Sequence, residues 1–150
     1  MKLAEALIER ADLQRRLEQL KQRLNQNAQY QEGEEPAEEP NALLAEYRQT
    51  TTELEQLIIK INLANNRISL ENGQLMVEAL AKRDRLKAEH STLINLADSA
   101  TQTFDRYSRS EIKTLAAIDV KAIRKQIDEL AKQHRQLDTQ IQQANWLSEI

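Results

Sequence analysis

The sequence predicts an all-α protein, and three observations support this fold class. Leu, Ala, Glu, Gln, Lys and Arg dominate the composition, which is typical of long helices and coiled coils. The chain has only two glycines, far fewer than a β-rich protein needs for its turns. Apolar residues recur at alternating spacings of three and four along four segments. We therefore expect a coiled-coil-like, antiparallel four-helix bundle that forms a single helical domain over residues 1–150.

The first two helices are predicted from continuous apolar stripes. The first helix runs from about Lys2 to Ala28, and its stripe consists of Leu13, Leu17, Leu20 and Leu24. The second helix begins near Pro40, because proline suits the first helical position. Its predicted stripe consists of Leu44, Tyr47, Thr51, Leu54, Ile58, Ile61, Asn65 and Ile68.

Asn72 and Gly73 mark the connection between the second and third helices. This dipeptide is a signal for a type I′ hairpin turn, in which both central residues have positive φ. Two interpretations stay open. One is a small β-hairpin over residues 68–76, and the other is a plain helix–helix turn with Gly73 left-handed, because an isolated hairpin is marginally stable.

The third and fourth helices carry polar residues within their stripes. The third is expected from about Leu75 to Tyr107, with the stripe Met76, Ala79, Arg83, Leu86, His90, Leu93, Ala97, Ala100, Phe104 and Tyr107. The fourth follows a cap at Asp119 and ends near Leu147, with the stripe Val120, Ile123, Ile127, Leu130, His134, Leu137, Ile141 and Ala144. Residues 108–118 support two readings: Ser108 and Glu111 fit a capping box, whereas the alternation from Ile112 to Ile118 suits an extended segment.

Antiparallel packing of the four helices predicts which residues meet at each end. Leu7 and Ile8 would meet a C-terminal apolar group, Trp146, Leu147 and Ile150. At the opposite end, the acidic stretch "QEGEEPAEEP" (31–40) would lie beside a basic segment that contains Arg106, Arg109 and Lys113. We therefore expect an ordered acidic cap, with Glu32, Glu34 and Glu35 docked on that basic segment.

The same packing predicts one polar layer that contains His90, His134 and Thr51, with Thr51 near Leu17 and Glu18. A metal site of two imidazoles and Glu18 is one interpretation of this layer. We favour a hydrogen-bonded layer that fixes the register, which is an established use of polar core positions in bundles.

Sites with established chemistry are not expected. Carboxylate-bridged di-iron bundles place Glu three residues before each His, where this sequence has Lys87 and Ala131. The absence of cysteine excludes disulfides and thiolate chemistry, and no phosphate-binding glycine loop, nucleophile elbow or HExxH motif occurs. We predict that the protein is not an enzyme and has no catalytic, cofactor-binding or metal-binding residues.

Charge and hydropathy narrow the classes of partner. The net charge of −3, and the acidic residues mixed among Lys82, Arg83, Arg85 and Lys87, argue against nucleic-acid binding. No apolar run approaches the roughly 20 residues that span a bilayer, and the acidic N-terminal segment is unlike a signal peptide. We expect a cytoplasmic protein without a membrane span.

Several pieces of the chain, in order, suggest a family. They are "MKLAEALIERADLQRRL", "QNAQYQEGEEPAEEP", "LIIKINLANNRI", "LAKRDRLK", "RYSRSEIK" and "LDTQIQQANW". Together they resemble a family of short, uncharacterised bacterial proteins, some of which carry the label septicolysin. The resemblance implies no known activity, substrate or catalytic residue. The septicolysin label implies a cytolysin, but this sequence shows no secretion signal, membrane-spanning segment or cysteine.

These observations favour a structural or protein–protein interaction role. We expect a self-associating helical bundle, a homo-oligomer with an unidentified protein partner. The alternatives are weak nucleic-acid binding and, with less support, septicolysin-like membrane activity.

Overall fold

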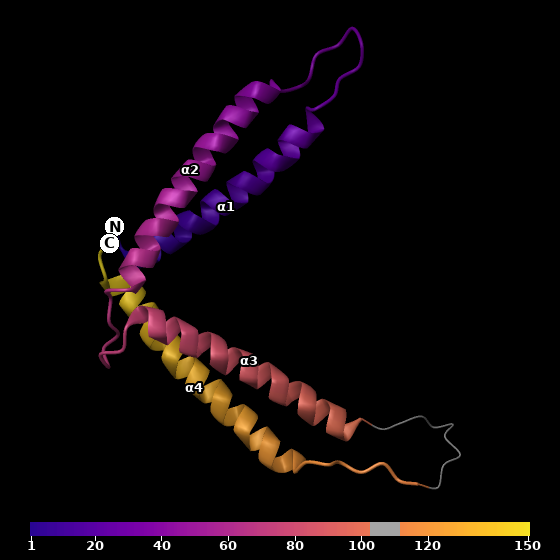
Figure 1. Ribbon diagram of the computed structural model, residues 1–150, viewed down its shortest axis with the longest axis vertical. Helices are drawn as coiled ribbons and strands as arrows, with labels where there is room; N and C mark the ends of the chain where they lie inside the picture. The colour runs from indigo at the N-terminus through magenta and orange to yellow at the C-terminus, as the bar shows by residue number, and fades with distance from the viewer. Residues whose placement is uncertain (103–111) are drawn as a thin grey trace. The chain divides into compact units, whose positions relative to one another are not determined.

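The computed structural model describes residues 1–102 and 112–150. These residues form four α-helices and no β-strand: α1 (Leu3–Gln26), α2 (Pro40–Asn65), α3 (Met76–Thr101) and α4 (Val120–Leu147) (Figure 1). The all-α prediction is therefore confirmed, and the helix bounds lie close to those expected except at the end of α3. That helix ends at Thr101, followed by extended backbone at Gln102, whereas the prediction placed its end near Tyr107. Phe104 and Tyr107, the last predicted residues of the third stripe, lie outside the described residues.

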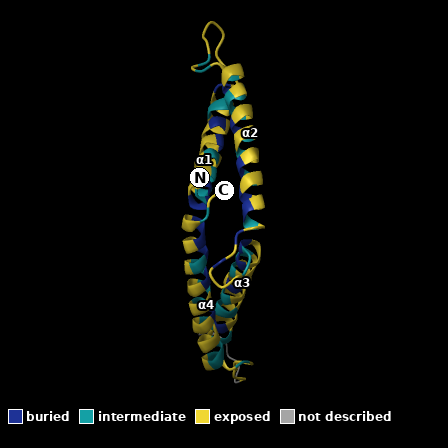
Figure 2. Cartoon of the chain, turned by 90° about the vertical axis from the view of Figure 1, so that its left-hand side faces the viewer, coloured by how far each residue is buried: buried dark blue, intermediate teal, exposed yellow. Residues whose placement is uncertain are grey.

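The contacts divide the chain into two compact units. The α1–α2 unit contains residues 1–69 and 143–150, and the α3–α4 unit contains residues 70–142. In the described helices the buried residues follow one side of each helix, and the opposite side is exposed (Figure 2). The line of contact between two paired helices is called the seam below.

In the α1–α2 unit the two helices run antiparallel, side by side (Figure 1). Arg16 Nη2 of α1 lies 2.7 Å from Glu46 Oε1 of α2, and this ion pair marks the register. The buried residues of α1 are Leu3, Ala4, Ala6, Leu17 and Leu20, and those of α2 are Leu43, Thr50, Leu57, Ile61 and Ala64. The predicted α1 stripe is confirmed, since Leu17 and Leu20 lie at its centre.

The prediction for the buried stripe of α2 was wrong at every second position, where the buried residue is the one before the predicted residue. The buried residues are Leu43, Thr50, Leu57 and Ala64, and the predicted residues Leu44, Thr51, Ile58 and Asn65 are only half-buried. Both sets alternate at spacings of three and four with the shared members Tyr47, Leu54, Ile61 and Ile68. Periodicity alone therefore could not choose between two adjacent stripes that both contain Leu or Ile.

Three successive threonines lie in the middle of α2, and each hydroxyl bonds to the backbone of the preceding turn. Thr50 Oγ1 donates to the Glu46 carbonyl at 2.8 Å, and Thr51 and Thr52 donate to the Arg48 carbonyl at 2.7 and 3.0 Å. Such bonds satisfy a hydroxyl within its own helix. Thr50 can therefore be buried at the seam without a partner from α1.

The first and last residues of the chain pair through their backbones within the α1–α2 unit. Lys2 and Glu149 form an isolated antiparallel bridge, and the Leu3 amide donates to the Ser148 carbonyl at 3.0 Å. Lys2 Nζ also lies 2.7 Å from Glu149 Oε1. The predicted meeting of the start of the first helix and the end of the fourth is therefore found.

The side chains expected at that meeting behave differently from the prediction. Ile8, Trp146 and Leu147 are each more than half exposed, so they do not form a buried apolar cluster. Backbone hydrogen bonds and an ion pair hold this end of the unit, where we had expected burial of apolar side chains.

In the α3–α4 unit the two helices also run antiparallel (Figure 1). Arg83 Nη1 of α3 lies 2.8 Å from Asp138 Oδ1 of α4, and Arg124 Nη2 of α4 lies 4.0 Å from Asp98 Oδ1 of α3. The buried apolar residues of this unit are Leu70, Met76, Ala79, Leu86, Ala97, Leu130, Leu137 and Ile141. All but Leu70 belong to the predicted stripes, which are confirmed for both helices.

The caps explain where the helices begin. Glu39 accepts a hydrogen bond from the Ala42 amide at 2.8 Å, so Pro40 occupies the first position of α2 as predicted. Asp119 accepts from the Ala122 amide at 3.1 Å and caps α4, also as predicted. Carboxylates at these positions satisfy amides that have no partner within the helix.

The connection before α3 is a tight, hairpin-like turn. The Gly73 amide donates to the Leu70 carbonyl at 2.9 Å, and the Leu70 amide donates to the Gln74 carbonyl at 2.8 Å. Gly73 has a φ of 84°, whereas no non-glycine residue in the described ranges has a positive φ. Of the two open interpretations, the type I′ hairpin turn needs a positive φ at Asn72 as well and is wrong, whereas the left-handed Gly73 of the plain turn is found. The pattern fits a three-residue loop that ends in a left-handed glycine.

The described part of the connection before α4, residues 112–119, is not helical. It supports the extended reading for this part, and Ile112 and Leu115 are strongly exposed. Ser108 and Glu111, which suggested a capping box, lie outside the described residues. Across residues 1–102 and 112–150, no helix has the length and apolar character needed to cross a bilayer.

Candidate functional site

The acidic loop between α1 and α2 is ordered by contacts with the last turns of α1. Arg23 Nε donates to Glu38 Oε2 at 3.0 Å, and the Glu38 amide donates to Asn27 Oδ1 at 2.9 Å. Asn27 is buried, and its Nδ2 donates to the Arg23 carbonyl at 2.8 Å. The hydrogen bond from Arg23 lowers the pKa of Glu38, and the same contact raises the pKa of Arg23. The loop therefore folds back along the helix that precedes it.

This anchor differs in its partner from the predicted acidic cap. The predicted cap used Glu32, Glu34 and Glu35, which are exposed, whereas the structure joins Glu38 to Arg23 of α1, a contact that sequence reasoning missed. Arg106 and Arg109, two of the predicted partners, lie outside the described residues. A basic residue in the last turn of a helix, followed by a run of glutamates, was the signal that could have identified Arg23.

The acidic loop offers no built cation site. Glu32, Glu34 and Glu35 are exposed. No group of three or more His, Cys, Asp or Glu side chains in the described ranges is arranged to hold a metal ion.

Two histidines define the candidate site, which lies on the seam of the α3–α4 unit. Lys87 and His90 of α3, together with Ala131 and His134 of α4, line a hollow of about 250 Å³. Within each helix the two residues are three positions apart, so they share one face. The predicted proximity of His90 and His134 is therefore found, and we call this feature the histidine hollow.

The other predicted members of the polar layer lie in the α1–α2 unit. Thr51 donates its hydroxyl to the Arg48 carbonyl, and Glu18 forms an ion pair with Lys21 at 2.7 Å. The Arg16–Glu46 pair sets a register in which Thr51 is level with about Ala11. The expected proximity of Thr51 to Leu17 is wrong by more than a helical turn, because the acidic loop folds back on α1.

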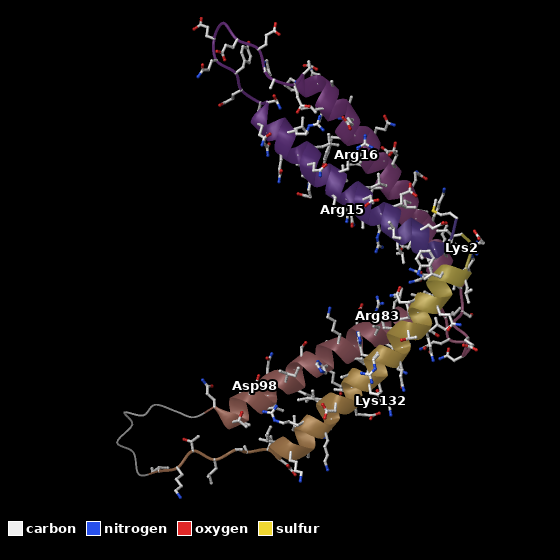
Figure 3. All side chains as sticks on the ribbon, turned by 180° about the vertical axis from the view of Figure 1, so that it is seen from behind. Lys2, Arg15, Arg16, Arg83, Asp98 and Lys132 are labelled. Atoms are coloured by element: carbon white, nitrogen blue, oxygen red, sulfur yellow. The ribbon has the colours of Figure 1, made fainter. Side chains whose placement is uncertain are left out.

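A half-buried ion pair lies one turn from the histidine hollow. Arg83, which is 28% exposed, donates to Asp138, which is 39% exposed, at 2.8 Å (Figure 3 labels Arg83). This hydrogen bond is the main cause that holds the pKa of Asp138 below its usual value, and contributions from Gln142 and His134 act in the same direction. The carboxylate of Asp138 is thus stabilised in its charged form and already accepts a hydrogen bond from Arg83.

Two other arginines of this unit lie beside carboxylates. Arg85 pairs with Glu89 at 3.0 Å, and Arg124 lies 4.0 Å from Asp98. This mixture of charges is typical of a solvated helix surface. At the histidine hollow, His134 interacts electrostatically with Asp138, and Lys87 and His90 form no ion pair among the described residues.

Comparisons with known proteins place the chain in a family. It is similar to a functionally unknown conserved protein from Corynebacterium diphtheriae, whose crystal structure matches with a TM-score of 0.93 and 43% identity, covering 100% of this chain and 98% of that one. No curated protein matches the chain. The model of a family of unknown function, DUF6847, matches residues 10–150. These findings confirm the predicted resemblance to an uncharacterised bacterial family, and neither match carries the label septicolysin. The chain belongs to the family of unknown function DUF6847.

Proposed function

We propose that the protein is a helical interaction module that associates with a second copy of itself. The observation that carries the proposal is an exposed apolar pair on α2. Ile59 and Leu63 are 45% and 64% exposed. They are four residues apart, which places them on one face of the helix. They lie two positions from the buried residue Ile61, so this face points away from the seam with α1.

The energetics of a symmetric contact support self-association. A two-fold interface brings the same patch of both copies together, so each apolar side chain is buried twice. Full burial of a Leu or Ile side chain contributes roughly 1.5–3 kcal/mol. Four such side chains therefore offset a substantial part of the roughly 4–15 kcal/mol that association costs in lost freedom of motion. Ile8 of α1, also exposed, would add to the same effect if it joined the interface.

Sedimentation equilibrium, with a matched pair of variants, tests the proposal. Leu63→Ser removes an exposed apolar side chain, and Asn62→Ser changes the adjacent exposed residue, which is already polar, so no apolar surface is lost. We expect the parent chain and Asn62→Ser to dimerise with the same affinity. Leu63→Ser should dimerise at least about tenfold more weakly, because two buried leucine contacts are lost per dimer.

Two outcomes would contradict self-association through this face. One is a parent chain that stays monomeric at all concentrations, and the other is a Leu63→Ser variant that dimerises as tightly as Asn62→Ser. Circular dichroism of each variant checks that the helices are intact, so that a loss of association is not a loss of folding.

A further inference from the structure

We propose that the histidine hollow binds a small phosphate-type oxyanion, either a free ion or a phosphomonoester. The hollow lies in the α3–α4 unit, whereas the proposed self-association face lies on α2, so the two proposals are independent. The ammonium group of Lys87 and the imidazoles of His90 and His134 supply three sets of nitrogen donors around one space of about 250 Å³.

The donors of the hollow are not used elsewhere. In the described parts of the chain, Lys87, His90 and His134 make no hydrogen bond or ion pair, whereas Arg83 and Arg85 on the same helix both do. Lys87 is exposed and the two histidines are half-buried, so a ligand from solvent can reach all three side chains. A bound oxyanion would provide acceptor oxygens for all three side chains at once.

Ala131 provides the space. It occupies the position of α4 that, with His134, faces Lys87 and His90 across the seam. A leucine at this position would fill much of the hollow with apolar atoms. The small side chain and the three donors together make a recess that an oxyanion can enter.

The charges around the hollow favour an anion over a metal cation. No carboxylate lines the hollow. The carboxylate one turn away, Asp138, already accepts hydrogen bonds from Arg83 at 2.8 Å and from Gln142 at 3.5 Å. Lys87 would repel a cation bound between the imidazoles. Charge-assisted hydrogen bonds from an ammonium or an imidazolium to a phosphate oxygen are stronger than bonds between neutral groups.

Nuclear magnetic resonance of the histidine side chains in the full chain tests the site, with inorganic phosphate as the probe. We expect phosphate to shift the imidazole signals of both His90 and His134 in one saturable process, with a Kd on the order of 1 mM. Lys87→Gln and Ala131→Leu should each weaken binding by about tenfold or more, because one removes a charge and the other removes the space. Lys125→Gln, which neutralises an exposed lysine two turns away on α4, should bind like the parent chain.

The Ala131→Leu variant distinguishes a built site from general charge attraction, because it leaves every charge unchanged. A response that does not saturate, or that is the same in Ala131→Leu and Lys125→Gln, would overturn the proposal. Circular dichroism should show that each variant keeps its helical content. In Lys87→Gln the imidazole signals without phosphate should be unchanged. Weaker phosphate binding can then not be explained by misfolding.

Two further titrations identify the ligand class. Phenyl phosphate binding more tightly than inorganic phosphate would assign the site to phosphomonoesters, and the reverse order would assign it to the free ion. The groups that face the imidazoles are Lys87 on α3 and the Arg83–Asp138 pair one turn away. Tight zinc binding by both histidines with no phosphate response would show a cation site and would overturn the proposal.

Discussion

The α1–α2 unit and the α3–α4 unit are both antiparallel helical hairpins, but their seams are filled differently. In the first, Leu20 and Ile61 are completely or almost completely buried, and the buried Thr50 is satisfied within its own helix. In the second, His90 and His134 occupy stripe positions and line an open hollow. The comparison shows that one periodic pattern can build either a dry apolar seam or a polar recess, depending on a few substitutions within the stripe.

The connections differ in the same way. The acidic loop between α1 and α2 is held by Arg23 and Asn27. In the described part of the connection between α3 and α4, apolar residues such as Leu115 are exposed. In the α1–α2 unit, contacts hold both the seam and the connecting loop. We therefore expect substitutions there to lower the free energy of unfolding more than substitutions in the α3–α4 unit.

The largest effect should come from truncating a buried side chain at the seam of the α1–α2 unit. Leu20→Ala removes a fully buried side chain and should lower the free energy of unfolding by about 2–5 kcal/mol. Leu93→Ala, at a half-buried position of the α3 stripe, should cost less than roughly 2 kcal/mol, because less apolar area is lost. Urea titrations followed by circular dichroism measure both changes. Equal losses would show that the two seams do not differ in packing.

The next largest effect concerns the anchored loop. Asn27→Ala leaves the Glu38 amide without its acceptor and should destabilise the protein by about 1–3 kcal/mol. Cleavage by a glutamate-specific protease after Glu32 or Glu34 should become faster, because the loop is released. Asn25→Ala, an exposed change two residues earlier in the chain, is the control and should alter neither result. Unchanged cleavage of Asn27→Ala would show that Asn27 does not hold the loop.

A gain in stability should follow when the histidine hollow is made apolar. The double variant His90→Leu with His134→Leu should raise the free energy of unfolding by about 0.5–2 kcal/mol, because the recess is filled by apolar side chains. The matched double change to glutamine, which keeps polar side chains, should give no such gain. Thermal melts of both variants provide the measurement. A clear loss in the leucine variant would mean that the imidazoles stabilise the seam.

The smallest effect should come from the ion pair beside the hollow. Asp138→Asn should cost at most about 1 kcal/mol at pH 7, because the pair is partly exposed. Arg83 lowers the folded-state pKa of Asp138, so the stabilisation is present above the unfolded-state value of about 4 and is lost as the pH falls through the folded-state pKa. The difference in stability between the parent chain and Asp138→Asn should therefore shrink when the pH is lowered below about 4. Asp128→Asn, at an exposed site on the same helix, is the matched control for the loss of one carboxylate.

The helices could be predicted from sequence because their signals are local. Pro40 and Asp119 begin helices for reasons that involve only their neighbours, and the stripes of α3 and α4 follow one periodicity. The stripe of α2 was harder, because Leu43 and Leu44 begin two adjacent stripes of similar apolar character. Choosing between them depends on how α1 packs, which the pattern of α2 alone does not contain.

The candidate site was predictable in part for the same reason. His90 and His134 could be paired because both lie on stripes of consecutive antiparallel helices. Thr51 was misplaced because its level along α1 depends on how the intervening loop folds. The Arg23 anchor that folds that loop back is a contact between residues 15 positions apart, which helical periodicity does not encode.

The three threonines of α2 have a consequence for motion within the helix. The carbonyls of Glu46 and Arg48 accept threonine hydroxyls at the positions where the amides of Thr50 and Thr52 also need them. A shared acceptor weakens each bond, and such hydroxyl contacts often bend a helix. We therefore expect the middle of α2 to exchange its amide hydrogens faster than the turns on either side. A long helix usually frays from its ends, and this one has a built-in point of opening near its centre.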